Sequence, residues 1–167
     1  GINLAAFIHN NTDVLILTVL TNLKTVSVYS VYLLVINGVK SLLISILSSF
    51  IPTLGRLIAK KDINELNSFF DLYEFFSMSI NFLAYTLTSI LILPFIMIYT
   101  KNMTDTNYFQ PIFAILMIIA ELLYCIREPY INMAYQSGHF TQIRKYAYIE
   151  SILNLVISIT LATKFGL

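Results

Sequence analysis

Charge, cysteine, histidine and tryptophan are all scarce in this chain. Charged residues make up 11% of its 167 positions, against about 25% in a typical soluble domain. A net charge of +1 gives no basic surface of the kind that binds nucleic acid. The single cysteine, Cys125, excludes an intramolecular disulfide and a cysteine-based zinc site, and the two histidines stand far apart. We therefore expect no nucleic-acid partner, no metal site and no cofactor.

Apolar residues, by contrast, dominate the sequence. Hydrophobic residues account for 57% of it, with 12 Phe and 11 Tyr, and the mean hydropathy is +0.78. A soluble fold of this length could not hide so much apolar surface from water, so lipid is the natural solvent. Only helices or closed barrels satisfy backbone groups in lipid, and the apolar runs are longer than barrel strands. The sequence therefore predicts an all-α, integral membrane helical bundle.

Five apolar segments are long enough to cross a bilayer, at about 20 residues per span. They cover residues 2–21, 28–58, 75–100, 108–135 and 146–163. The second is longer than a bilayer requires and should tilt or project from it. Pro94 and Pro129 lie inside the third and fourth segments, where each should kink the helix, and both are hinge candidates.

No soluble domain is visible, and residues 1–167 are interpreted as one transmembrane fragment. Gly1 begins directly within an apolar segment, without the basic region or cleavage site of a signal peptide. The last residues, 164–167, have the character of a helix that continues. We expect the chain to be a piece of a longer membrane protein.

Lysine and arginine are distributed unevenly between the two sides of the expected spans. The connections after the second and fourth spans carry Arg56, Lys60, Lys61, Arg144 and Lys145. The connections on the other side carry Lys24, Lys101 and Lys164. Because cytoplasmic loops are enriched in these residues, we expect the first set to lie in the cytoplasm.

Several ionisable residues lie inside these apolar segments. They are Asp13, Lys40, Glu121, Arg127, Glu128 and Glu150. Since a charge at the centre of a bilayer is costly, such residues usually face a bundle interior or a water-filled cavity. Together with Asn154, they are our candidates for a substrate path or for ion coupling.

Helical spacing places some polar residues on common faces. In the fourth span, one face carries Glu121, Tyr124, Glu128, Asn132 and Tyr135, and Arg127 should project about 100° away from it. In the second span, serines form a stripe that we expect to hydrogen-bond to neighbouring helices. The stripe comprises Ser30, Ser41, Ser45 and Ser48, together with Asn37.

Two interpretations of the charged residues remain open. In the first, Glu128 pairs with Arg127, or Lys40 with Asp13, in structural ion pairs. In the second, they line a hydrated path with cationic sites for an anionic substrate. The Arg127 fork would bind pyrophosphate oxygens and Lys40 would act as a point charge. A carboxylate such as Asp13 or Glu150 could then couple proton movement.

Catalytic motifs are missing from the sequence. It contains no H-E-x-x-H, G-x-S-x-G or Walker pattern. Glu121 and Glu128 share a face, but they have no third ligand or nucleophile beside them. We therefore expect that the chain is not an enzyme.

Six strings carry more information than composition does. They span residues 10–17 (NNTDVLIL), 26–32 (VSVYSVY), 52–55 (PTLG), 127–130 (REPY), 138–140 (GHF) and 150–158 (ESILNLVIS). In this order they resemble the bacterial Wzx-like polysaccharide flippases of the polysaccharide transporter family. That family belongs to the superfamily that also contains multidrug and toxin extruders and lipid II flippases.

The resemblance implies a two-lobed transporter, of which this chain would be the first five spans of the second lobe. Its N-terminal lobe and C-terminal helices would be further parts of the same chain. The implied activity is flipping of an undecaprenyl-pyrophosphate-linked oligosaccharide across the bacterial inner membrane by alternating access, driven by protons or sodium. Membrane lipid and the lipid-linked oligosaccharide would be its partners, and the protein would be multi-pass.

Two alternatives remain. A multidrug extruder of the same superfamily should favour acidic cavity residues, whereas a flippase for a pyrophosphate lipid should favour arginine and lysine. Lys40 and Arg127 favour the flippase. A membrane enzyme of cell-envelope polysaccharide assembly would need a catalytic loop outside the membrane, and the longest loop expected here, 58–74, has no convincing catalytic cluster.

Overall fold

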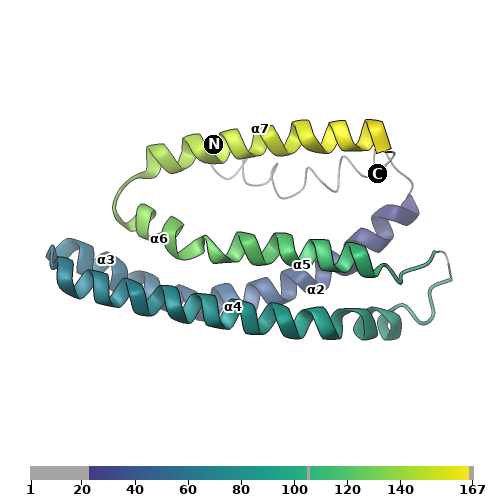
Figure 1. Ribbon diagram of the computed structural model, residues 1–167, viewed down its shortest axis with the longest axis horizontal. Helices are drawn as coiled ribbons and strands as arrows, with labels where there is room; N and C mark the ends of the chain where they lie inside the picture. Colours follow the sequence, from purple (N-terminus) through teal and green to yellow (C-terminus); the bar gives the residue numbers. More distant parts are fainter. Residues whose placement is uncertain (1–22, 105, 166–167) are drawn as a thin grey trace. The chain divides into compact units, whose positions relative to one another are not determined.

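The computed structural model describes residues 23–104 and 106–165 (Figure 1). Every regular element among them is a helix, which confirms the all-α fold class. The elements are α2 (Leu23–Leu47), η1 (Ser48–Phe50), α3 (Ile51–Lys60), α4 (Ile63–Tyr99), α5 (Pro111–Ile126), α6 (Glu128–Gln136) and α7 (Phe140–Phe165). The expected first span, 2–21, lies outside the described residues.

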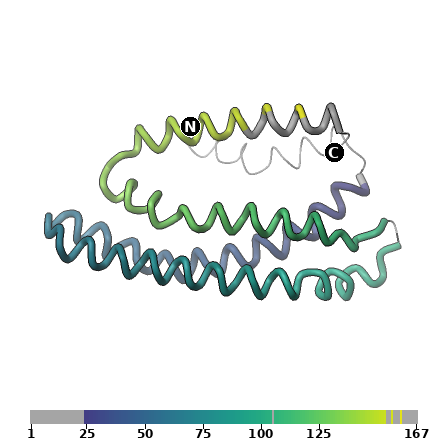
Figure 2. The backbone as a smooth tube through the Cα atoms, in the orientation of Figure 1, coloured from purple at the N-terminus to yellow at the C-terminus, as the bar shows by residue number. Residues whose placement is uncertain are grey.

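The chain divides into two compact units. One is Val31–Phe140, and the other combines Gly1–Ser30 with Thr141–Leu167. In the first unit, α4 packs against α3, α5 and α6, and α3 also contacts α6. The backbone trace shows the α3–α4 turn at one end of α4 and the α4–α5 connection at the other (Figure 2). The described part of the second unit consists of the start of α2 and nearly all of α7.

The expected second span is helical but interrupted. Its helix gives way to the 3-10 turn η1 before resuming as α3, with Pro52 near the start of α3. Proline has no N–H to donate to the carbonyl four residues earlier, here that of Ser48, and the turn tightens so that the Ile51 N–H bonds this carbonyl instead. The physical cause of the interruption is therefore visible in the sequence.

The prediction that the serine stripe hydrogen-bonds to neighbouring helices was wrong for three of its serines. The hydroxyls of Ser30, Ser45 and Ser48 donate to carbonyls of their own helical run, at 2.8, 2.8 and 2.9 Å. This back-bonding satisfies a hydroxyl without a neighbouring helix and tends to bend the helix that carries it.

Helix α4 is longer than expected. It begins at Ile63 and not near Phe75, because Asp62 caps it: the Asp62 carboxylate accepts the Glu65 N–H at 3.1 Å. Lys61, at φ 58°, ends α3 in the left-handed region just before this cap. With 37 residues, α4 is about 55 Å long. Pro94 lies inside it, as expected.

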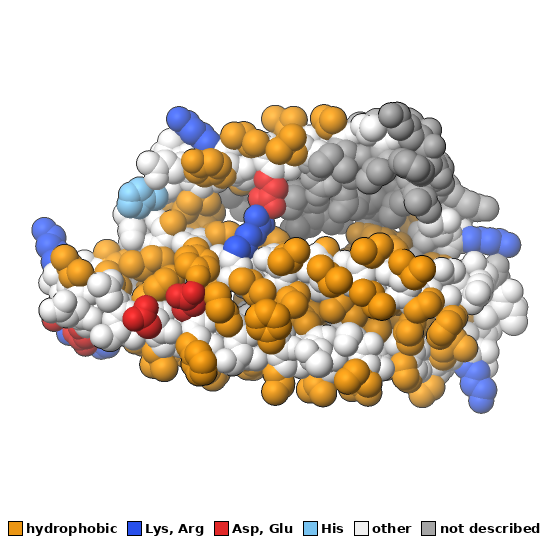
Figure 3. Space-filling model, in the orientation of Figure 1, with side chains coloured by type: hydrophobic (Ala, Val, Ile, Leu, Met, Phe, Trp, Pro, Cys, Tyr) orange, Lys and Arg blue, Asp and Glu red, His pale blue; other side chains and the backbone are white. Residues whose placement is uncertain are grey.

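The buried face of α4 is a stripe that contains five polar residues. The stripe is Tyr73, Ser77, Asn81, Tyr85, Thr88, Ile92 and Ile96. The outward face is apolar, with Phe75 71%, Leu83 63% and Ile90 64% exposed. Figure 3 shows hydrophobic side chains spread over the visible surface of α4 and α5. This distribution is the reverse of that in a water-soluble helix.

The expected fourth span is broken at Arg127. Helix α5 starts at Pro111, the first-turn position that favours proline. It ends at Ile126, and α6 starts at Glu128 with the buried Pro129 in its first turn. Since Pro129 cannot donate to the Cys125 carbonyl, the expected single span divides into two helices here.

The last connection is shorter than expected. Gly138, at φ +82°, ends α6 in the conformation that glycine tolerates best. Helix α7 then begins at Phe140, so residues 140–145 are helical and the expected loop 136–145 reduces to 137–139.

One buried tyrosine joins α2 to the start of α5. The Tyr32 hydroxyl donates to the Tyr108 carbonyl at 2.8 Å and accepts the Gln110 N–H at 3.1 Å. Its ring packs edge-on against Phe113, with centroids 5.3 Å apart. These contacts fix the register between two helices that are distant in the sequence.

Within residues 23–104 and 106–165, two helical segments are long and apolar enough to cross a membrane. They are Lys24–Lys60 and Ile63–Tyr99, each of 37 residues, with hydropathies of 1.9 and 2.0. Only 22% of the most apolar window is buried in each. The core helix of a soluble protein would be mostly buried, so these helices differ from that class.

Candidate functional site

An ion pair joins α2 to α5 in the middle of apolar sequence. The Lys40 ammonium lies 2.7 Å from the Glu121 carboxylate, and the two side chains are 24% and 19% exposed. The Lys40–Glu121 pair differs from both pairings expected from the sequence. Those were Lys40 with Asp13, which lies outside the described residues, and Arg127 with Glu128.

Tyr124 brings the two cations of this region together. The Lys40 ammonium lies 3.9 Å from the centre of the Tyr124 ring, and the Arg127 guanidinium carbon lies 4.6 Å from it. Cations are attracted to the electron-rich face of an aromatic ring, more strongly where water is excluded. We call Lys40, Glu121, Tyr124 and Arg127 the cation cluster.

The position of Arg127 corrects one expectation. The side chain was expected to point about 100° away from the face of Glu121 and Tyr124. It lies over the Tyr124 ring instead. Arg127 follows Tyr124 by three residues, which places the two side chains within reach on a helix, and its own position is the junction between α5 and α6.

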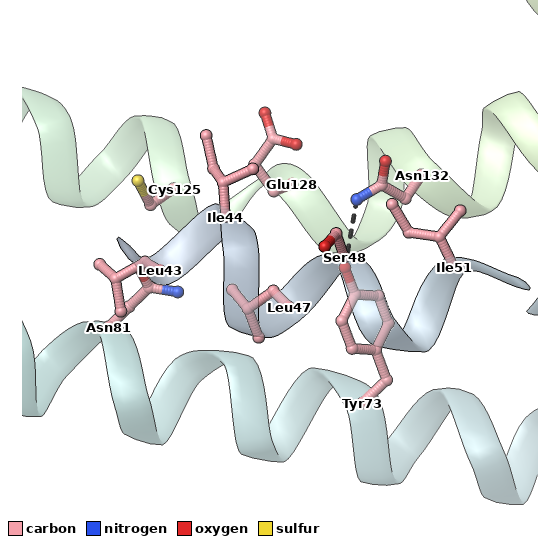
Figure 4. Close-up of a pocket in the computed structure, with 10 residues that line it drawn as sticks. All are labelled: Leu43, Ile44, Leu47, Ser48, Ile51, Tyr73, Asn81, Cys125, Glu128 and Asn132. Carbon is pink, nitrogen blue, oxygen red and sulfur yellow. Dashed lines mark hydrogen bonds between the residues drawn. The ribbon is translucent and has the colours of Figure 1, made fainter. Parts of the chain in front are cut away.

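A pocket of about 130 Å³ lies beside the two helix interruptions (Figure 4). Its lining consists of Leu43, Ile44, Leu47, Ser48, Ile51, Tyr73, Asn81, Cys125, Glu128 and Asn132. In this view the Glu128 carboxylate points away from α4, whereas Asn132 donates to the Tyr73 hydroxyl at 3.1 Å. The pocket is therefore part apolar and part polar.

Asn81 presents an unsatisfied acceptor in this region. Its side chain is fully buried, and its amide nitrogen donates to the Ser77 carbonyl at 2.7 Å. Its amide oxygen has no hydrogen-bond partner among the described residues. An unpaired buried carbonyl of this kind is uncommon and costs free energy.

The structure brings together four of the seven path candidates. Lys40, Glu121 and Arg127 meet in the cation cluster, and Glu128 lines the adjacent pocket. Glu150 is exposed on α7, in the other unit. Asp13 and the side chain of Asn154 lie outside what the structure describes.

Sequence reasoning missed the polar stripe of α4. The segment 75–100 contains no charged residue, and the polar members of the stripe, Ser77, Asn81, Tyr85 and Thr88, are all uncharged. These residues recur at spacings of four, four and three, which places them on one helical face. Tyr85 uses this position to contact the Cys125 sulfur at 3.3 Å.

Among the described residues, no group of three or more His, Cys, Asp or Glu side chains is arranged to hold a metal ion. No family model matches the chain, and neither a curated protein nor a solved structure was found to match it. The argument for function therefore depends on the residues of this chain.

Proposed function

We propose that this chain is part of a bacterial inner-membrane transporter that flips an oligosaccharide linked to a lipid pyrophosphate. The single observation that carries the proposal is the cation cluster, in which Lys40 and Arg127 contact the same ring between apolar helices. The Wzx-like resemblance of the strings in the sequence supports the same substrate class. The lipid-linked oligosaccharide and membrane lipid are the proposed partners.

The distribution of polarity supports placement in a membrane. Residues such as Ile98 and Ile112 are each 76% exposed, whereas Ser77 and Asn81 are fully buried. Water would make this arrangement unfavourable, and lipid makes it favourable. A bundle that is multi-pass in the inner membrane would present the apolar surface to acyl chains and keep the polar groups inside.

The chemistry of the cation cluster supports an anionic substrate. A guanidinium binds two phosphate oxygens at once, and an ammonium adds a point charge. Both act more strongly where water is excluded. A pyrophosphate that reached both Lys40 and Arg127 would be held by two cations, while its lipid tail could stay in the bilayer.

The pocket gives one specific reason to keep a multidrug extruder as the second candidate. Glu128 and Tyr73 line it together with apolar side chains, a combination that suits an organic cation. The two functions differ in which residue matters most: Arg127 for the flippase, and Glu128 for the extruder.

The test uses the full-length protein in cells and measures polysaccharide export alongside membrane abundance. We expect Arg127→Lys to impair export nearly as much as Arg127→Ala, because lysine lacks the fork that binds two oxygens. Arg56→Ala, an exposed arginine of α3, is the matched control and should export normally. Normal export by Arg127→Ala at normal abundance would remove this residue from the mechanism.

A structural role for Arg127 predicts a different pattern. If its charge only balances Glu128, Arg127→Ala should lower abundance, and Arg127→Ala with Glu128→Ala should restore it. Under the proposed function, the double variant stays defective in export. Glu128→Gln with intact export but lost resistance to cationic drugs would instead support the extruder.

A further inference from the structure

We infer that Glu121 is an internal competitor for the substrate's phosphate groups and so determines which anions the cation cluster accepts. This inference rests on the proposed function. It adds that a carboxylate of the chain itself already pairs with Lys40. An incoming anion must displace Glu121 from Lys40 before it gains both cations.

The geometry carries this inference. The Glu121 carboxylate lies 2.7 Å from the Lys40 ammonium, the distance at which a phosphate oxygen would bind. The Lys40 ammonium also lies over the Tyr124 ring, at 3.9 Å from its centre. The Lys40 ammonium is thus contacted by the Tyr124 ring and by the Glu121 carboxylate at once.

Competition of this kind discriminates between anions by charge. A monoanion offers Lys40 no more charge than the Glu121 carboxylate already does. A pyrophosphate carries several negative charges, so it can replace the carboxylate at Lys40 where a singly charged headgroup cannot. Glu121 would therefore raise specificity at the expense of affinity.

The experiment measures binding of inorganic pyrophosphate to the purified full-length protein in detergent by calorimetry, at fixed pH and ionic strength. A parallel series with a short polyprenyl pyrophosphate tests whether the lipid tail adds affinity. We expect Glu121→Gln to lower the apparent Kd by roughly tenfold, because it removes a like charge from the anion site. Glu121→Asp, with a shorter reach, should give an intermediate value.

Two further variants make the result specific. When Lys40→Gln is combined with Glu121→Gln, the apparent Kd for pyrophosphate should no longer fall, because the cation that Glu121→Gln makes available has been removed. Glu65→Gln removes the carboxylate of the exposed pair with Lys60, whose separation is 3.8 Å. It should leave the Kd for pyrophosphate unchanged, and it controls for a general change in charge.

The outcomes separate the two proposals. If the wild type binds pyrophosphate and a folded Glu121→Gln variant binds it equally or more weakly, the competitor role is wrong and the proposed function stands. If neither the folded wild type nor any folded variant binds pyrophosphate or the polyprenyl pyrophosphate, both fail. Equal tightening by Glu65→Gln would show that net charge alone is responsible and would also overturn the inference.

Discussion

Lys40 and Glu121 form an ion pair with a separation of 2.7 Å, and they bridge α2 and α5 across 81 positions of sequence (121 minus 40). Both side chains retain some exposure, at 24% and 19%. The pair is therefore less costly to bury than a fully enclosed one, and its removal should have a moderate effect.

Loss of one partner of this pair should destabilise the protein more than loss of both. We expect Lys40→Ala to lower the free energy of unfolding by about 1–3 kcal/mol, because Glu121 is left as a charge without its cation. Lys40→Met with Glu121→Leu should recover most of this loss. Thermal unfolding in detergent measures the change in stability. If the double variant loses as much stability as the two single variants lose together, the argument is contradicted.

The hydroxyl of Tyr32 should contribute measurably to stability. Tyr32→Phe removes the donor to the Tyr108 carbonyl and the acceptor for the Gln110 N–H, while preserving the ring. Leaving these backbone groups unpaired should cost about 1–3 kcal/mol. The matched control is Tyr99→Phe, at a tyrosine that is 51% exposed and should change little. Equal unfolding temperatures for the two variants would argue against the role of this contact.

Replacement of Asn81, unlike that of Tyr32, should stabilise the protein. Its amide oxygen is buried without a partner among the described residues, so Asn81→Leu removes an unsatisfied polar group and adds apolar volume. We expect the free energy of unfolding to rise by about 1 kcal/mol. Ser89→Ala, on the exposed face of α4, serves as a neutral control. A substantial loss of stability in Asn81→Leu would show that the oxygen is satisfied in the native protein.

Two glycines should respond oppositely to the same change. A Cβ atom would meet nothing within 4 Å at Gly38 or at Gly138, but Gly138 has φ +82°. Gly38→Ala should stabilise α2 by about 0.5–1 kcal/mol through helix propensity. Gly138→Ala should destabilise the α6–α7 turn by about 1 kcal/mol, because alanine disfavours positive φ. Thermal unfolding of both variants tests the sign; two shifts of the same sign would contradict it.

The orientation in the membrane can be tested by labelling. In a Cys125→Ala background, Lys101→Cys should react with an impermeant thiol reagent added outside, and Lys60→Cys should react only after the membrane is opened. Both positions are exposed. Lys60 is preferable to Lys61, whose φ of 58° makes substitution there a change of backbone as well. The reverse labelling pattern would invert the topology.

Much of the helical framework could be predicted from local signals. Apolar length identified the described helices, Pro111 marked the start of α5, and Pro129 marked its interruption. The start of α4 was misplaced because its first turns are polar. The Asp62 cap, with Glu65 three residues later, was the available signal.

The pairing within the cation cluster could not be predicted in the same way. Helical spacing related Glu121 to Tyr124, which lie on one helix. It carried no information on which residue of α2 would stand opposite them. That register depends on tertiary contacts such as those of Tyr32 with residues 108 and 110, and these become known only once the helices are packed.

The two interruptions lie next to each other in space, since Ser48 and Glu128 line the same pocket, while α4 passes both of them without a break. A continuous helix thus lies beside two interrupted ones. Helices α3 and α6, which follow the interruptions, contact each other so closely that a Cβ on Gly55 would stand 2.7 Å from the Gln136 side-chain oxygen. Because α3 and α6 contact each other and both pack against α4, the segments that follow the two interruptions form one packed unit. The unbroken α4 therefore connects this unit to the region of the Lys40–Glu121 pair.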